Sequence, residues 1–101
     1  MIRASFSYLS GPSAHFDFGY YVDRHIPLAR RLLDPVRLEV DRGVSAEERG
    51  SAPRCTCVAH LYFASLDDYY RALDAHGEEL GEDMPNYTNA ELEILVSEII
   101  A

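Results

Sequence analysis

The sequence predicts an α+β fold of the ferredoxin-like type, with a four-stranded antiparallel sheet and two helices on one face. Strand-like alternation and helix-like spacing follow one another in the order β-α-β-β-α-β, which is the order of that fold. No stretch has the composition of a linker, so we expect a single domain over residues 1–101. The strand-like segments are residues 2–9, 36–41, 56–63 and 91–99, and the helix-like segments begin at Asp17 and Ser65.

The strands are predicted from side chains that alternate along the chain. In residues 2–9 the larger apolar side chains occupy every second position, as in a strand with one buried face. Residues 36–41 alternate apolar with charged side chains, which is typical of a strand with one wet face or of an edge strand. Residues 43–54 are rich in glycine, serine and charge and lack any period, which indicates a loop.

The first helix is predicted to begin at Asp17, because a short carboxylate can accept hydrogen bonds from the free N–H groups of a first turn. Pro27 lies inside this helix and cannot donate a hydrogen bond to the carbonyl of Asp23. We therefore expect a kink or a tightened turn between Asp23 and Ile26. His25 lies in that turn.

The second helix is predicted to begin at Ser65, in a segment that resembles a capping box, and to end at Pro85. Of two adjacent tyrosines in it, we expect Tyr69 in the core and Tyr70 at the surface. The residues at helical spacing that predict its buried stripe are Leu66, the pair Tyr69 and Tyr70 (of which Tyr69 is the core member), Leu73, Gly77, Leu80 and Met84.

Two helices can cover only one face of the sheet, so the other face must meet solvent or a second sheet. That second face carries polar, apolar and aromatic side chains, and it is too apolar for an ordinary solvent-exposed surface. We expect a second copy of the chain to cover it as a C2 homodimer, with a partly polar cavity between the two sheets. The residues predicted on this face are Ser5, Ser7, Val58, His60, Tyr62, Glu93 and Leu95.

Composition excludes several classes of protein. The chain has 9 basic and 17 acidic residues, a net charge of −8, so we expect it to bind neither nucleic acid nor an anionic membrane surface. Every basic residue is arginine, which excludes Schiff-base chemistry and a P-loop lysine. There is no dinucleotide-binding motif or nucleophile elbow, and we expect no cofactor. No apolar run is long enough to span a bilayer or to form a signal peptide, and we expect a cytoplasmic location.

Two histidines are candidates for acid–base chemistry, because imidazole titrates near neutrality. His25 lies at the turn that Pro27 disturbs; the alternative is a histidine that packs between helices. His60 shares a strand face with Tyr62, and both could hydrogen-bond a substrate oxygen; the alternative is a histidine at the dimer interface.

Further polar and aromatic residues are candidates for substrate binding. Asn86 and Tyr87 lie in a loop directly before the last strand, where turn-forming roles are the alternative. Tyr21 shares a helix face with His25 at the i, i+4 spacing. No metal site is expected, because Cys55 and Cys57 share one face of their strand while His60 lies on the other.

Several stretches resemble one family. Residues 17–28, DFGYYVDRHIPL, resemble the D-x-x-Y-Y-x-x-x-H-x-P-L signature of the EthD family, small proteins named for an ethyl tert-butyl ether degradation operon. Further similar stretches follow in the family's order. They are residues 40–43 (VDRG), 59–63 (AHLYF), 84–89 (MPNYTN) and 97–98 (SE). The last strand departs from the family's usual proline and glutamine at Leu92 and Leu95, which predicts a different pocket wall.

The resemblance implies a dimeric α/β barrel, in which two ferredoxin-like chains pack through their sheets. It implies degradation-associated or oxidoreductase activity only loosely, since the wider group spans cofactor-free monooxygenases, isomerases, cyclases, dehydratases and haem enzymes. The leading interpretation is a small homodimeric protein of catabolic or secondary metabolism. In it, His25 and His60 transfer protons on a small carbonyl- or phenol-containing molecule, as in an isomerase, dehydratase, cyclase or cofactor-independent oxygenase. The alternatives are a non-catalytic ligand-binding protein that serves a degradation pathway and a purely structural dimer.

Overall fold

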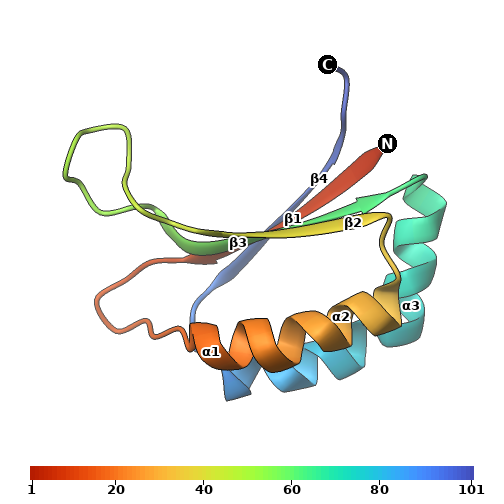
Figure 1. The fold of residues 1–101 in the computed structure, drawn as a ribbon, viewed down its shortest axis with the longest axis horizontal. Helices are drawn as coiled ribbons and strands as arrows, with labels where there is room; N and C mark the ends of the chain where they lie inside the picture. The colour runs from red at the N-terminus through yellow and green to blue at the C-terminus, as the bar shows by residue number, and fades with distance from the viewer.

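Four strands form one antiparallel sheet in the computed structural model, which describes residues 1–101 (Figure 1). The spatial order β2-β3-β1-β4 places the first and third strands at the centre. This is the predicted ferredoxin-like arrangement, and the predicted strand ends differ from the observed ones by one residue at most. The strands are β1 (Ile2–Leu9), β2 (Arg37–Arg42), β3 (Cys55–Phe63) and β4 (Leu92–Glu98).

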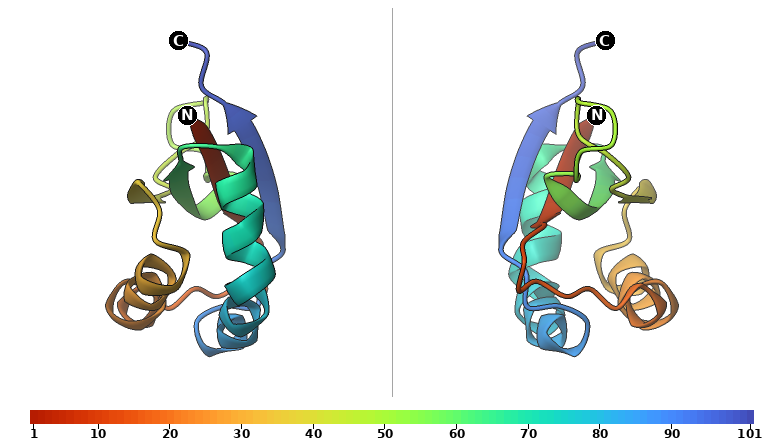
Figure 2. Two further views of the ribbon diagram at one scale, coloured as in Figure 1. Left: turned by 90° about the vertical axis from the view of Figure 1, so that its right-hand side faces the viewer. Right: turned by 90° about the vertical axis from the view of Figure 1, so that its left-hand side faces the viewer.

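Two helical arms pack on one face of this sheet and leave the other face free (Figure 2). None of the helices is both long enough and apolar enough to cross a membrane. The first arm consists of α1 (Phe18–Tyr20), η1 (Tyr21–His25) and α2 (Ile26–Leu33), and the second of α3 (Leu66–Asp83) and η2 (Met84–Asn86).

Both helical arms begin at the predicted caps. The Asp17 carboxylate accepts a hydrogen bond from the backbone N–H of Tyr20 at 3.0 Å, and the Ser65 hydroxyl accepts one from the N–H of Asp68 at 3.1 Å. These bonds satisfy N–H groups that a first helical turn leaves without a backbone partner.

The helix is irregular before Pro27, as expected, but the turn there widens, where we expected a kink or a tightened turn. Element η1 is a π-helix, in which the backbone N–H of Ile26 reaches back five residues to the carbonyl of Tyr21. Pro27 has no N–H to offer, and the backbone accommodates this by inserting one extra residue into the turn. The result is a local bulge that carries His25.

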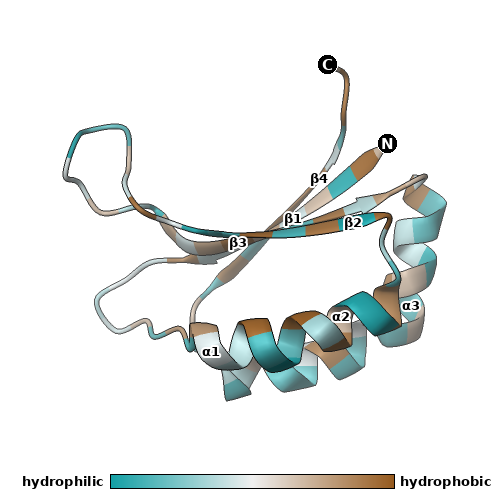
Figure 3. Ribbon diagram, viewed as in Figure 1, coloured by the Kyte–Doolittle hydropathy of each residue, from teal (hydrophilic) through white to brown (hydrophobic).

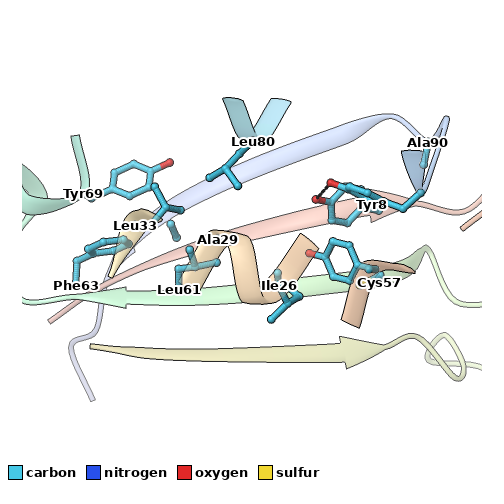
Figure 4. Close-up of a cluster of buried hydrophobic side chains, with 14 residues drawn as sticks. Tyr8, Ile26, Ala29, Leu33, Cys57, Leu61, Phe63, Tyr69, Leu80 and Ala90 are labelled. Atoms are coloured by element: carbon cyan, nitrogen blue, oxygen red, sulfur yellow. Dashed lines mark hydrogen bonds between the residues drawn. The ribbon is translucent and has the colours of Figure 1, made fainter. Parts of the chain in front are cut away.

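The core lies between the sheet and the helices (Figure 4). Hydrophobic and hydrophilic residues alternate along the strands (Figure 3), and the apolar set faces the helices. Tyr69 is buried and Tyr70 is 52% exposed, as predicted. Leu66 is 40% exposed, so its place in the predicted buried stripe is wrong. As the first residue of α3, it lies at the end of the helix rather than over the sheet.

The free face of the sheet carries the residues predicted for it. Ser5 pairs with His60 on one side and with Leu95 on the other, so these three side chains share a face. Leu95 is 64% exposed there. The free face is therefore partly apolar, as the alternation of its strands predicts.

Candidate functional site

A cavity of about 230 Å³ lies between the sheet and its own helices. We expected a cavity between the sheets of two paired chains, whereas this space lies within one chain, on the helix-covered side of its sheet. The lining is mostly apolar, and its polar groups are one imidazole and three phenols. The lining residues are Phe6, Tyr8, Tyr21, His25, Ile26, Ala29, Leu33, Ala59, Leu61, Leu73, Gly77, Leu80, Gly81, Met84, Tyr87, Leu92 and Ile94.

His25 reaches this cavity from the widened turn η1 and is only 7% exposed. Its ring stacks on Tyr21, with ring centres 5.3 Å apart, and lies 4.6 Å from the ring of Tyr87. π-type bulges occur often at functional sites, because they turn a side chain away from the regular helical face. The two aromatic neighbours restrict the imidazole to one orientation.

Asp83 fixes the tautomer of the His25 ring through a hydrogen bond. Its Oδ2 lies 2.9 Å from His25 Nδ1. The opposite oxygen, Oδ1, accepts hydrogen bonds from the Tyr20 hydroxyl at 2.6 Å and from the Asn86 amide at 2.9 Å. Burial alone would raise the pKa of this carboxyl, but the hydrogen bonds from Tyr20, Asn86 and His25 outweigh it and hold the pKa below its ordinary value. Ionised Asp83 can only accept, so His25 Nδ1 carries a proton and donates it to this bond.

Two buried phenols lie beyond the imidazole, on the side of the ring away from Asp83. The Tyr87 hydroxyl lies 3.4 Å from His25 Nε2 and 2.8 Å from the Tyr8 hydroxyl (Figure 4 draws the latter bond). Burial is the main reason that the pKa values of both Tyr8 and Tyr87 rise above the ordinary value of a phenol. Both hydroxyls therefore keep their protons at neutral pH. The hydrogen-bonded row Asp83–His25–Tyr87–Tyr8 is the most polar part of the cavity region.

This row has the parts that acid–base chemistry needs. With Nδ1 donating to a carboxylate, the free lone pair of a neutral His25 ring is on Nε2, which faces Tyr87. A carboxylate partner also stabilises the imidazolium that forms when Nε2 takes up a proton. The long 3.4 Å contact to Tyr87 is weak, so a ligand group can displace it at little cost.

His60 and Tyr62 lie on the free face, on the opposite side of the sheet from His25. His60 Nδ1 is 2.9 Å from the Ser5 hydroxyl, and its Nε2 is 2.9 Å from Asp41 Oδ2. The Tyr62 hydroxyl donates to Glu39 at 2.9 Å, a bond that lowers the pKa of Glu39. Neither residue lines the cavity. The expectation that the two histidines share one pocket is therefore wrong, because strand alternation turns His60 away from the helices.

The other predicted ligand-binding residues lie near His25. Tyr21 and Tyr87 both line the cavity and are almost fully buried. Asn86 does not line it; its exposed amide donates to Asp83 and to the Tyr20 hydroxyl. Asn86 thus contacts the carboxylate that orients His25, rather than the space where a ligand would lie.

Sequence reasoning missed Asp83 and Tyr8. Asp83 had a detectable signal, since it is an acidic residue in the last turn of α3 and that turn contains no basic residue. Negative charge at a helix C-terminus opposes the helix dipole, and a broken local rule of this kind often marks a functional residue. Tyr8 had a weaker signal, a polar group at the end of an otherwise apolar strand face.

The two cysteines lie outside this constellation. Both are free thiols, and no group of three or more His, Cys, Asp or Glu side chains converges as metal ligands would. Cys57 is fully buried on the helix side of β3, and that burial raises the pKa of its thiol to about 12. A thiol with such a pKa is protonated and poorly nucleophilic at neutral pH.

Comparison with solved structures places the fold among known proteins. An EthD-like protein from Ralstonia eutropha JMP134 superimposes with a TM-score of 0.93 and 27% identity, over 99% of this chain and 92% of that one. An EthD-family protein from Bacillus halodurans C-125 gives a TM-score of 0.75 and 17% identity, over 99% of each chain. A DABB-family protein from Mesorhizobium loti MAFF303099 with a ferredoxin-like fold gives 0.60 and 16% identity, over 99% of this chain and 97% of that one.

The family model described as the EthD domain matches residues 11–91. Among curated proteins, none matches the chain significantly. The matched segment contains His25, Asp83 and Tyr87, so the row that borders the cavity is built almost wholly from it. By this match over most of its length, the chain belongs to the EthD family.

Proposed function

We propose that this protein is an acid–base catalyst that moves protons on a small, neutral molecule bearing a carbonyl or phenol group. The observation that carries the proposal is the buried row Asp83–His25–Tyr87–Tyr8 at the edge of an apolar cavity. Isomerisation, dehydration, cyclisation and cofactor-independent oxygenation all begin with such a proton transfer. His60, which lies across the sheet, takes no part in the chemistry of this cavity.

The cavity lining favours an uncharged ligand. It contains no arginine, aspartate or glutamate, so a charged ligand would lose its hydration without gaining a partner of opposite charge. The volume of about 230 Å³ is below the range of about 300–1,000 Å³ of drug-sized pockets. An apolar cavity of about 150 Å³ is enough to hold benzene. A small aromatic molecule of one or two fused rings with a short polar substituent is therefore the ligand class that we propose.

In the proposed reaction, His25 and Tyr87 act on opposite ends of the reacting group. His25 Nε2 takes a proton from the carbon next to a carbonyl, and the resulting imidazolium is stabilised by Asp83. The Tyr87 hydroxyl donates a hydrogen bond to the oxygen on which negative charge develops. Tyr8 supports Tyr87 through the 2.8 Å bond between their hydroxyls. The imidazolium then returns a proton to the same or a neighbouring carbon.

We further propose that the free face of the sheet pairs with a second copy of the chain, as the resemblance to the EthD family implies. Leu95 is 64% exposed on that face. On the same face, Nε of Arg3 is buried without a hydrogen-bond partner in the single chain. A second sheet would cover the leucine and could supply an acceptor for the arginine, whose unpaired donor is otherwise costly. His60 would then be an interface residue.

The catalytic proposal is tested by hydrogen exchange on a single-ring ketone. Acetophenone is incubated with the protein in D₂O, and proton NMR follows the loss of its methyl signal. We expect the protein to accelerate exchange and the His25→Gln variant to lose about a hundredfold or more of that rate. His15→Ala is the matched control, since His15 is exposed and makes hydrogen bonds only through its backbone. We expect it to retain the full rate.

Each outcome has a distinct meaning. Exchange that survives in His25→Gln would overturn the role of the imidazole. Binding of acetophenone to the unaltered protein without any acceleration would overturn catalysis and leave the carrier interpretation, which predicts stabilisation by the ligand through mass action alone.

A further inference from the structure

The wall that helix α3 contributes to the cavity contains two glycines one helical turn apart, Gly77 and Gly81. Glycine is the poorest helix former after proline, because its backbone loses the most freedom on folding. Two glycines within one helix weaken it, so their presence calls for a physical reason.

Neither packing nor backbone conformation supplies that reason. A β-carbon built on Gly81 would meet no atom within 4 Å, and one on Gly77 would meet only Leu73, at 3.8 Å and beyond. Neither glycine has a positive φ, which in this chain occurs among glycines only at Gly50. Gly43 is a contrasting case, because a β-carbon there would overlap the carbonyl oxygen of Cys55.

The feature that the two positions share is the cavity. Gly81 is exposed and lines it together with Ile94, which is 49% exposed, so this part of the lining is the mouth between α3 and β4. Gly77 is partly buried and lies one turn back along the helix. Both positions line the cavity, and at both a side chain would enter open space rather than displace protein atoms.

We propose that Gly77 and Gly81 are specificity-determining residues that set the size of the ring the cavity accepts. Gly81 widens the mouth, and Gly77 widens the space behind it. The two missing side chains let a planar ring pass α3 and bring its oxygen to His25 and Tyr87. The inference rests on the proposed function for the orientation of the ligand, but the size limit itself is independent of catalysis.

The experiment measures binding rather than turnover. Dissociation constants for phenol and for the larger 1-naphthol are determined by NMR titration for the unaltered protein, Gly77→Ala, Gly81→Ala and the double variant. Because alanine favours the helix and meets no clash, we expect each single variant to melt about 3–6 °C higher. We expect the double variant to bind 1-naphthol about tenfold or more weakly, through overpacking, and phenol within about threefold of the original.

Ala75→Gly is the matched control, since Ala75 is exposed on the same helix and does not line the cavity. It should lower the melting temperature and leave both dissociation constants unchanged. Undiminished binding of 1-naphthol by the double variant would overturn the inference. A fall in melting temperature on Gly→Ala substitution would also overturn it. Failure of the unaltered protein to bind phenol or to bind 1-naphthol would do the same. If both probes bind as expected but acetophenone exchange is not accelerated, the proposed catalysis fails and the size limit stands.

Discussion

Nδ1 of His25 lies 2.9 Å from Oδ2 of Asp83, although 58 positions separate the two residues in the sequence. His25 belongs to η1 in the first helical arm, and Asp83 is the last residue of α3 in the second. The pair therefore joins the two arms beside the cavity. One contact both holds the helices together and sets the tautomer of the imidazole, so the stability of the protein and its chemistry depend on the same carboxylate.

The first prediction concerns stability in acid. The pKa of Asp83 is lower in the folded chain than in the unfolded one, so the unfolded state binds more protons at low pH. The stabilisation is fully present above the unfolded value of about 3.9 and is lost as the pH falls through the folded value. Asp83→Asn should cost about 1–2 kcal/mol at neutral pH, and the difference should shrink below about pH 4. Urea unfolding from pH 7 to pH 2 measures this.

The control for this prediction is Asp74→Asn, an exposed aspartate of the same helix that makes no hydrogen bond through its side chain. It should follow the unaltered protein at every pH. A free-energy difference for Asp83→Asn that stays constant down to pH 2 would show that the carboxylate contributes no acid-dependent stability.

The second prediction concerns the ionisation of the cavity tyrosines in alkali. Burial raises the pKa values of Tyr8, Tyr21 and Tyr87 in the folded chain. Their contribution to stability is therefore complete below the unfolded value of about 10 and is lost as the pH rises toward the folded values. Absorbance at the tyrosinate band should show these three phenols ionising only together with unfolding, as followed by circular dichroism. Ionisation of all seven tyrosines in a folded protein would contradict this.

Much of the fold was predictable because its signals are local. Alternation in Ile2–Leu9 and helical spacing after Ser65 depend only on which side chains face the core, and the caps at Asp17 and Ser65 act within one turn. Tyr21 was predicted on the face of His25 from their i, i+4 spacing, and both line the cavity.

The rest of the site depends on contacts that no local pattern encodes. The sequence signals that Pro27 disturbs its helix, but whether the preceding turn narrows or widens depends on how the backbone redistributes its hydrogen bonds. The cavity itself arises where two helical arms and the sheet fail to fill the space between them. Asp83 could be paired with His25 only once the two arms were placed side by side.

The third prediction separates the two phenols of the row. Tyr87 adjoins His25, whereas Tyr8 contacts Tyr87 through its hydroxyl. Tyr87→Phe should slow acetophenone exchange about a hundredfold, because it removes the proposed donor to the developing negative charge. Tyr8→Phe should slow it by about tenfold or less, because it removes only the bond that orients Tyr87. Both variants should bind phenol within a small factor of the original, and equal losses of rate would contradict the assigned order.

The last prediction tests the role of the free face. If two chains pair through their sheets, the unaltered protein should sediment at twice the chain mass of 11.4 kDa at micromolar concentration. Leu95→Arg places a charge on the exposed free face of the edge strand β4, within the proposed interface, and should yield monomers. Val44→Arg is the matched control, because Val44 is also exposed, at 86%, but lies in the loop after β2. Since the cavity lies within one chain, a monomeric Leu95→Arg variant should still bind phenol. A monomeric unaltered protein would refute the pairing and leave the acid–base proposal in place.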